Sequence, residues 1–363
     1  MTVRRALAFT GLCALLLAAS YGISPGVASA VPQNPPEQRQ APEAPACCKN
    51  QVVILHGFDM PAVSGKQLMN ASDPDLVKLD NQWVLFFTSA VKGPKMKNTI
   101  WEARLPKGAG LDSPPAAWKI DPEPLVQHVP DAWDSLGFET ASYVYGYDNT
   151  AKQWEARIYY TGYASYTELK IGYLRWNKAT SRWERFGGPV VDATTEWEFL
   201  KGKSLIGDMA VVYAPGPGRG GKGGAWHMYY NAASDKTAVV VHVVSADGRN
   251  WTHKRIALQG RGYYPDFALI KKQYELVGIT FEPRRAGLWW STATTPDGTA
   301  PGDWQTWSPL VYTQDGTPWH FHKLIGATFA WEKNKLWLFY SSWDEHKSGD
   351  SYIGRADCIL PGK

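Results

Sequence analysis

The chain has 363 residues, of which 44% are hydrophobic, 13% aromatic and 20% charged, so it can bury a large core and is not intrinsically disordered. A formal charge of +4 without an extended basic run is too small for an electrostatic nucleic-acid binder. The 34 glycines and 25 prolines favour many short strands joined by turns over long helices.

Residues 1–30 have the pattern of a secretory signal peptide. Arg4 and Arg5 form a charged start, Ala6 to Ala19 form an apolar run, and Ala28-Ser29-Ala30 resembles a cleavage site. The apolar run is shorter than the ~20 residues that span a bilayer, although an uncleaved anchor is the alternative. We therefore expect a secreted or periplasmic protein whose mature chain has no membrane span.

Residues 31–46 are rich in Pro, Gln and Glu and predict a disordered linker, which leaves 47–363 as a single folded domain. Three cysteines lie outside the signal, namely Cys47, Cys48 and Cys358. In an oxidising compartment a bridge from Cys47 or Cys48 to Cys358 would join the two ends of the domain. Three unpaired thiols are the alternative. No His or second Cys pair accompanies them, which argues against a metal site.

A two-part phrase recurs five times at intervals of roughly 60 residues. It consists of a short strand with an acidic or small residue at its start and an aromatic strand that ends in a small polar residue. The aromatic strands are expected at 83–89, 157–162, 226–231, 275–280 and 336–341. The short strands before them are expected to start near Asp73, Glu139, Asp208, Asp266 and Gly326.

Each unit continues with a third strand and a turn that leads to a Trp-bearing fourth strand, as in Val240 to Ser245 followed by Asp247 to Trp251. The sequence therefore predicts an all-β fold, a five-bladed β-propeller with four-stranded antiparallel blades. The Gly-rich insert 215–224 lacks the context of a phosphate-binding loop and is expected to be a hairpin tip. The Pro-rich segment Asn98 to Asp134 is expected to fold over a face of the ring.

The starts of the innermost strands of a propeller lie together at one mouth of the central channel. Four of the five units place a carboxylate there, at Asp73 and Asp75, Glu139, Asp208 and Asp266. Such crowding raises the pKa of at least one carboxyl, which separates a proton donor from an ionised base. Two carboxylates that flank a sugar bond are the usual apparatus of glycoside hydrolysis. Aspartates that cap turns before strands are the alternative.

The sequence resembles the five-bladed propeller glycosidases of the furanosidase superfamily, which include arabinanases, xylosidases and invertases. The resemblance spans Gln51 to Cys358. The phrases that carry it are Ser72 to Val77, Trp133 to Ser142, Gly207-Asp208, Tyr264-Pro265-Asp266 and Ser245 to Trp251.

The resemblance implies catalytic roles for particular carboxylates. Asp73 is implied as the base or nucleophile, and Asp208 as a residue that tunes pKa or stabilises the transition state. The Glu that usually acts as general acid is absent from the next unit, which has Tyr264 and Asp266 in its place. Glu139 is then the first candidate for the acid and Asp266 the second.

His320 and His322 precede the fifth short strand. By resemblance, a histidine there acts as the acid in some relatives or holds a central cation in others. The expectation is that no cofactor is required, with Ca²⁺ in the central channel, near His322, as an open alternative. Imidazoles satisfied by ordinary hydrogen bonds are equally consistent with the sequence.

Aromatic residues within the strands are expected to pack between blades, whereas those beside loops can stack on sugar faces. Arg284 and Arg285 follow the fourth unit's second strand and can bind a ligand carboxylate or hydroxyl; a solvated loop pair is the alternative. The loop aromatics are Trp133, Tyr263, Tyr264, Trp319 and Trp343. The substrate-binding candidates are Asp75, Asp266, Tyr264, Trp133, His322 and Arg284.

The leading hypothesis is a secreted, monomeric glycoside hydrolase with an oligo- or polysaccharide substrate, in which Asp73, Glu139 and Asp208 are the main carboxylates. A non-catalytic glycan-binding propeller is the second hypothesis, because the expected Glu near residue 264 is absent. A structural or protein-binding propeller is the third.

Overall fold

The computed structural model describes residues 46–57, 65, 67–92, 97–235, 238–259, 263–270, 273–280, 287–293, 295, 308–313, 315–320, 323–344 and 350–360. Within 263–270 and 273–280 the description covers the backbone. The proposed signal peptide and nearly all of the proposed linker lie outside these residues, as do Arg284 and His322.

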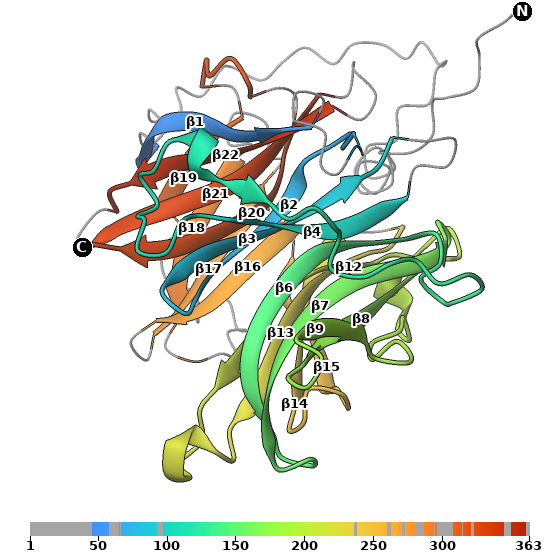
Figure 1. The fold of residues 1–363 in the computed structure, drawn as a ribbon. Helices are drawn as coiled ribbons and strands as arrows, with labels where there is room; N and C mark the ends of the chain where they lie inside the picture. Colours follow the sequence, from blue (N-terminus) through green and yellow to red (C-terminus); the bar gives the residue numbers. More distant parts are fainter. Residues whose placement is uncertain are drawn as a thin grey trace, which may run out of the picture.

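The described strands form five sheets, drawn in Figure 1. The first sheet contains β2 (Ser72–Leu79), β3 (Gln82–Ala90), β4 (Asn98–Arg104) and β5 (Lys119–Ile120). The second contains β6 (Gly137–Asp148), β7 (Gln153–Ser165), β8 (Glu168–Asn177) and β9 (Arg182–Arg185), extended by β10 (Phe199–Leu200) and β11 (Lys203–Ser204).

The third sheet contains β12 (Ile206–Ala214), β13 (Ala225–Ala233), β14 (Ala238–Ser245) and β15 (Thr252–Gln259). The fourth contains β16 (Tyr263–Ile270), β17 (Gln273–Thr280), β18 (Gly287–Ala293) and β19 (Ser308–Tyr312). The last contains β20 (Lys323–Glu332), β21 (Lys335–Asp344), β22 (Asp350–Cys358) and β1 (Cys48–His56). Three short 3₁₀ helices are also described, η1 (Pro115–Ala117), η2 (Glu196–Glu198) and η3 (Arg219–Gly221).

Four of the sheets are four-stranded and antiparallel and are arranged as blades of a β-propeller. The first strands of the five sheets contact one another in succession, β2 with β6, β6 with β12, β12 with β16, β16 with β20, and β20 with β2. These strands therefore surround a central channel, and the residues near their starts lie close together although they are far apart in sequence.

Aromatic side chains fill the space between neighbouring sheets. Phe87 and Trp101 of the first sheet pack with Trp337 and Phe339 of the last in one buried cluster. Because both faces of a blade's middle strands are covered, β3 is buried at almost every residue and reads as a continuous hydrophobic run. The expectation that strand aromatics serve inter-blade packing is confirmed for Phe86, Tyr159, Tyr229 and Phe339, each of which is buried in a cluster that joins residues of two sheets.

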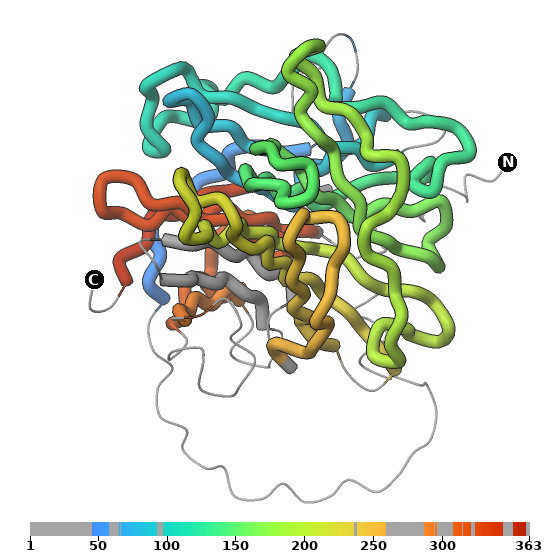
Figure 2. The backbone as a smooth tube through the Cα atoms, turned by 90° about the horizontal axis from the view of Figure 1, so that it is seen from below, coloured from blue at the N-terminus to red at the C-terminus, as the bar shows by residue number. Residues whose placement is uncertain are grey.

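The two ends of the described domain meet in one sheet. β1 pairs with β22 as the outer strand of the last sheet, so the blue and red segments of Figure 2 lie side by side. A disulfide joins Cys48 to Cys358, which are 310 residues apart in sequence, and Cys47 is a free cysteine. The structure thus identifies Cys48, and not Cys47, as the partner of Cys358.

Other connections agree only in part with the sequence. The Gly-rich insert 215–224 joins β12 to β13 as expected. The segment Asn98 to Asp134 does not serve only as a cover, because β4 and β5 within it complete the first sheet.

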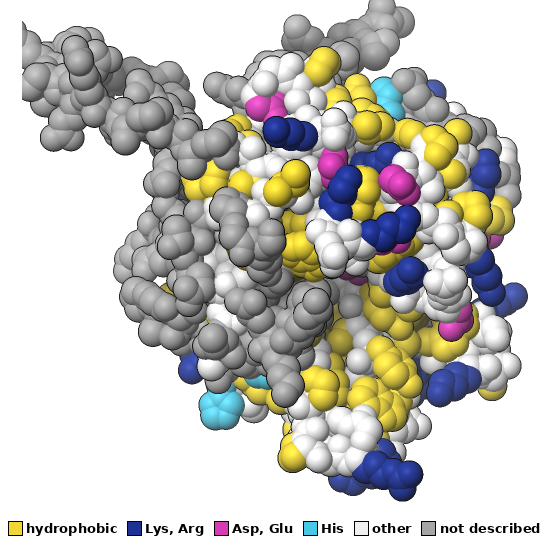
Figure 3. Space-filling model, turned by 90° about the vertical axis from the view of Figure 1, so that its left-hand side faces the viewer, with side chains coloured by type: hydrophobic (Ala, Val, Ile, Leu, Met, Phe, Trp, Pro, Cys, Tyr) yellow, Lys and Arg dark blue, Asp and Glu magenta, His cyan; other side chains and the backbone are white. Residues whose placement is uncertain are grey.

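On the face seen in Figure 3, Lys and Arg side chains are scattered, with Asp and Glu between them. None of the helices in the described part of the chain has the length and apolarity of a membrane span.

Candidate functional site

A β-bulge recurs near the start of the first strand of each sheet. At three bulges the first extra residue has a left-handed backbone, with φ of 51° at Asp73, 55° at Thr140 and 48° at Asp208. Non-glycine residues adopt this conformation at an energetic cost, and bulges near sites commonly re-aim a side chain. The bulge therefore fixes where these side chains point.

Hydroxyl groups of the preceding sheet hold each of these bulges. The backbone N–H of Asp73 donates to Ser341 Oγ at 2.9 Å, and that of Asp208 donates to Thr161 Oγ1 at 3.0 Å. Thr140 N–H donates to Thr88 Oγ1, also at 3.0 Å. The sequence shows these hydroxyls as the small polar ends of the aromatic strands, but sequence reasoning gave them no role.

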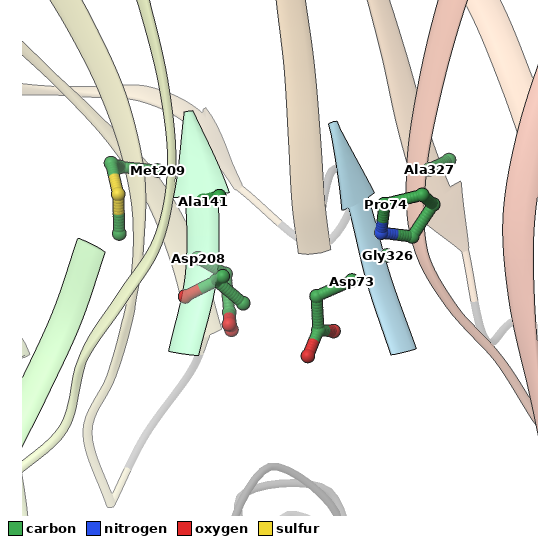
Figure 4. A pocket seen from close by; sticks show the side chains of 8 residues that line it. Asp73, Pro74, Ala141, Asp208, Met209, Gly326 and Ala327 are labelled. Atoms are coloured by element: carbon green, nitrogen blue, oxygen red, sulfur yellow. The ribbon is translucent and has the colours of Figure 1, made fainter. Parts of the chain in front are cut away.

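The bulges converge on a small pocket in the channel. Figure 4 shows the side chains of Asp73 and Asp208 reaching into the same space from opposite sides. Asp73 is 7% exposed and Asp208 6%, so both carboxyls are largely shielded from bulk water. The pocket is lined by Asp73, Pro74, Thr140, Ala141, Asp208, Met209, Gly326 and Ala327.

Burial raises the pKa of Asp73 to about 6, although the Ser72 hydroxyl, which donates to Oδ2 at 2.9 Å, acts in the opposite direction. The other oxygen, Oδ1, is buried and has no hydrogen-bond partner within the described residues. Asp208 Oδ2 accepts a hydrogen bond from Asn231 Nδ2 at 3.3 Å. The pocket thus holds two carboxyls in different hydrogen-bond environments, one of which titrates near neutral pH.

Gly326 occupies the equivalent position on β20. Its φ is 57°, and a Cβ there would lie 2.8 Å from Asp73 Cα and 3.0 Å from its Oδ1. Glycine is therefore required for β20 to approach Asp73 this closely.

Glu139 does not line this pocket. It lies one residue before the bulge, paired with Thr161, so Thr140 takes the position that Asp73 and Asp208 take on their strands. Its carboxylate instead accepts hydrogen bonds from Asn98 Nδ2 at 2.7 Å and Tyr163 Oη at 3.4 Å. The expectation of four carboxylates in one register was therefore wrong.

Asp75 lies beyond the bulge and links two strands. Its Oδ2 accepts a hydrogen bond from Tyr143 N on β6 at 2.6 Å. Ser142 Oγ and Thr328 Oγ1 accept from backbone N–H groups of neighbouring first strands in the same way, at 2.9 and 3.2 Å. Asp75 thus belongs to an inter-blade hydrogen-bond series and does not line the pocket of Asp73 and Asp208, contrary to its predicted grouping with Asp73.

For β16, the first strand of the fourth sheet, the structure describes the backbone. Asp266 pairs with Val277 directly after the bulge of β16, the register position that Asp75 has on β2, and Tyr264 lies within the bulge. Their side chains lie outside what the structure describes, so their predicted roles stay predictions, as do those of His322 and Arg284.

Trp133 packs inside the second blade. Its ring stacks on Tyr160 with centroids 5.7 Å apart, and a Cβ at Gly162 or Gly172 would lie 2.6 or 2.5 Å from it. The ring covers two glycines of β7 and β8 and does not line the pocket, so the predicted sugar platform is a packing residue here.

The side chain of His320 is buried and both of its ring nitrogens have hydrogen-bond partners. Nδ1 lies 2.8 Å from Asp315 Oδ1 and Nε2 lies 2.6 Å from Tyr340 Oη. Burial lowers its pKa, while Asp315 acts in the opposite direction. These contacts favour the interpretation as a satisfied imidazole.

Calcium in proteins takes six to eight oxygen ligands. Among the described residues, no group of three or more His, Cys, Asp or Glu side chains is placed to hold a metal ion. The described side chains of the pocket therefore do not by themselves form a calcium cage.

Scans of family models and of curated proteins find no match. Solved structures do share the fold. β-1,2-Mannobiose phosphorylase from Listeria innocua is 13% identical, with a TM-score of 0.56 over 85% of this chain and 96% of the other. Fructan 1-exohydrolase IIa from Cichorium intybus is 14% identical, with a TM-score of 0.54 over 83% and 57% of the two chains.

The catalytic domain of the Coprinopsis cinerea GH62 α-L-arabinofuranosidase is 13% identical, with a TM-score of 0.52 over 81% of this chain and 92% of the other. At these identities the likeness concerns the fold. It confirms, for the fold, the predicted resemblance to propeller glycosidases.

Proposed function

We propose that this protein is an exported glycoside hydrolase with Asp73 and Asp208 as its working carboxylates. The observation that carries the proposal is their placement on equivalent bulges of β2 and β12, facing one pocket. Hydrolysis of a glycosidic bond needs one carboxyl that gives a proton and one that acts as base or nucleophile.

The fold supports this proposal, because the structural neighbours include proteins titled as glycoside hydrolases and a phosphorylase. We propose a closed ring of five blades, the six-stranded sheet being one of them, which the successive contacts of the first strands support. The Cys48–Cys358 disulfide supports export to an oxidising compartment. We further propose a monomer in which residues 31–46 are a disordered linker.

We assign Asp73 as base or nucleophile, as the resemblance implies, and Asp208 as its partner. Glu139, the first candidate for the acid in the sequence, is not part of the proposed pair, because its carboxylate is held by Asn98 and Tyr163 and does not line the pocket. The proposed reaction requires no cofactor, and a Ca²⁺ ion in the channel would depend on residues such as His322.

The test is hydrolysis of β-1,2-mannobiose, arabinan, arabinoxylan and inulin by the wild type and by Asp73→Asn, each with and without inorganic phosphate. We expect sugar release from at least one substrate and its loss in the variant, with an unchanged circular dichroism spectrum. Turnover that requires phosphate would indicate phosphorolysis. Equal activity of the variant would refute the role of Asp73.

A non-catalytic glycan-binding propeller is the second candidate. It is favoured by the equivalent positions Thr140 and Gly326, which supply no further carboxyl to the pocket. Binding to one of these saccharides without turnover, at any pH between 4 and 8, would support it over the hydrolase.

A further inference from the structure

A second cavity lies farther along the same first strands. Its volume is about 370 Å³, within the range of about 300–1,000 Å³ typical of small-molecule sites. It shares no lining residue with the Asp73–Asp208 pocket. We call it the far cleft, lined by Asp75, Leu76, Val77, Ser142, Tyr143, Val144, Tyr145, Val211, Val212, Tyr213, Pro215, Thr328 and Phe329.

An exposed aromatic platform forms part of its rim. Tyr145 is 50% exposed and stacks on Trp154, with ring centroids 5.1 Å apart and an interplanar angle of 19°. Trp154 in turn meets Tyr213 edge-on at 5.4 Å. Such packing holds the Tyr145 ring in place while leaving it open to a ligand.

The Gly-rich insert contributes a wall of the far cleft. Tyr213 Oη donates to the Gly221 carbonyl at 2.8 Å and accepts from Gly224 N at 3.0 Å. Lys222 Nζ lies 5.4 Å from the centroid of the Tyr147 ring. Pro215, which begins the insert, lines the cleft itself. The insert is thus held against the rings of Tyr213 and Tyr147.

The lining chemistry selects among ligands. Its described side chains include the Asp75 carboxyl and tyrosine hydroxyls, and the carboxylate disfavours an anionic ligand by like-charge repulsion. A lipid chain would offer no hydrogen bond to the polar groups of the lining, such as the Asp75 carboxyl and the Tyr145 hydroxyl. A sugar ring offers both an apolar face for an aromatic ring and hydroxyls for polar groups.

We propose that the far cleft binds a neutral saccharide, separately from the Asp73–Asp208 pocket, with Tyr145 as the stacking platform. Binding in the far cleft requires no catalysis, so this proposal does not depend on whether the Asp73–Asp208 pocket hydrolyses sugars. In a hydrolase it would keep a polysaccharide chain on the enzyme.

Affinity electrophoresis in gels that contain yeast mannan, arabinan or inulin tests the proposal. The variants are Tyr145→Ala, Asp73→Asn, and Phe199→Ala as a control, which removes a 37% exposed ring from β10. We expect at least one polysaccharide to retard the wild type, Asp73→Asn and Phe199→Ala alike, and its apparent affinity for Tyr145→Ala to fall at least 10-fold.

Three results would overturn the assignment: retardation of Tyr145→Ala equal to wild type, loss of retardation in Asp73→Asn alone, or no retardation of the wild type by any of the three. Displacement by tetramethylammonium but not by free sugars would also overturn it, in favour of an organic cation. Because Asp73→Asn blocks only the proposed hydrolysis, its inactivity with intact binding separates the two sites.

Discussion

Asp73 combines a left-handed backbone, a largely buried side chain and a carboxyl whose pKa is raised to about 6 by that burial. The sequence indicated that this residue starts a strand at the channel mouth, and the structure agrees. Glu139, the corresponding residue of the second unit, does not line the pocket. Its position depends on the bulge of β6, which cannot be predicted from residue types.

Ionisation of Asp73 should cost folding free energy. The unfolded carboxyl loses its proton near pH 4 and the folded one near 6, so the unfolded state binds fewer protons in this window and stability falls as pH rises. The free energy of unfolding of Asp73→Asn should therefore be higher than that of the wild type by on the order of 2–3 kcal/mol at pH 7 and equal to it near pH 4. Urea unfolding at pH 4, 5.5 and 7 measures this, and a difference independent of pH would contradict it.

At the scale of strands, the recurring phrase predicted the first and second strand of every sheet, because a hydrophobic run and its turn signals are local properties. It did not predict which side chains share a face. Asp73 and Asp75 are two apart and would face the same side of a regular strand, but the extra residue at the bulge reverses the alternation. On β6 the bulge begins after Glu139, so Thr140 and not Glu139 lines the pocket.

Ser341→Ala tests whether β21 positions Asp73. The change leaves the buried Asp73 N–H without its acceptor, at a cost of about 1–3 kcal/mol. Ser245→Ala is the matched control, since it removes the acceptor of Gly248 N at a turn of the third sheet and Ser245 lines neither cavity. We expect similar losses of stability, but a fall in kcat/KM of about 10-fold or more only in Ser341→Ala. Equal kcat/KM in both variants would argue against positioning.

Arg157 joins the second and third sheets from a fully buried position. Its guanidinium donates to Asp148, Glu155 and the Asp247 carbonyl, between the rings of Tyr173 and Trp226, each 4.7 Å away. Nothing in the sequence distinguished this arginine from surface ones, because its partners come from separate strands and a turn.

Arg157→Met removes the fully buried cation from Asp148 and Glu155 and leaves them with Arg249, so it should cost about 3 kcal/mol in urea unfolding. Arg104→Met breaks the more exposed pair with Glu102 and should cost less than about 1 kcal/mol. A loss at Arg157 as small as that at Arg104 would show that the buried network adds little.

For the whole molecule, the repeat period and the end-to-end disulfide were readable from the sequence, whereas the choice between Cys47 and Cys48 was not. Pairing of Cys48 with Cys358 in the register of β1 and β22 decides it.

Cys358→Ser should lower stability by about 2–4 kcal/mol, because the bond restricts the unfolded chain over nearly its full length. Cys47→Ser should leave thermal unfolding unchanged. Peptide mapping after alkylation should find Cys47 as the labelled thiol. Comparable losses in both variants would indicate that Cys47, and not Cys48, forms the bond to Cys358.

The account depends most on Asp73 and Asp208 acting as a pair while Glu139 stays outside their pocket. The most direct measurement is kcat/KM of Asp73→Asn, Asp208→Asn and Glu139→Gln on whichever saccharide the wild type cleaves. We predict losses of about 100-fold or more for the two aspartate variants and less than about 10-fold for Glu139→Gln. Full activity in Asp208→Asn together with an inactive Glu139→Gln would contradict the proposed pair.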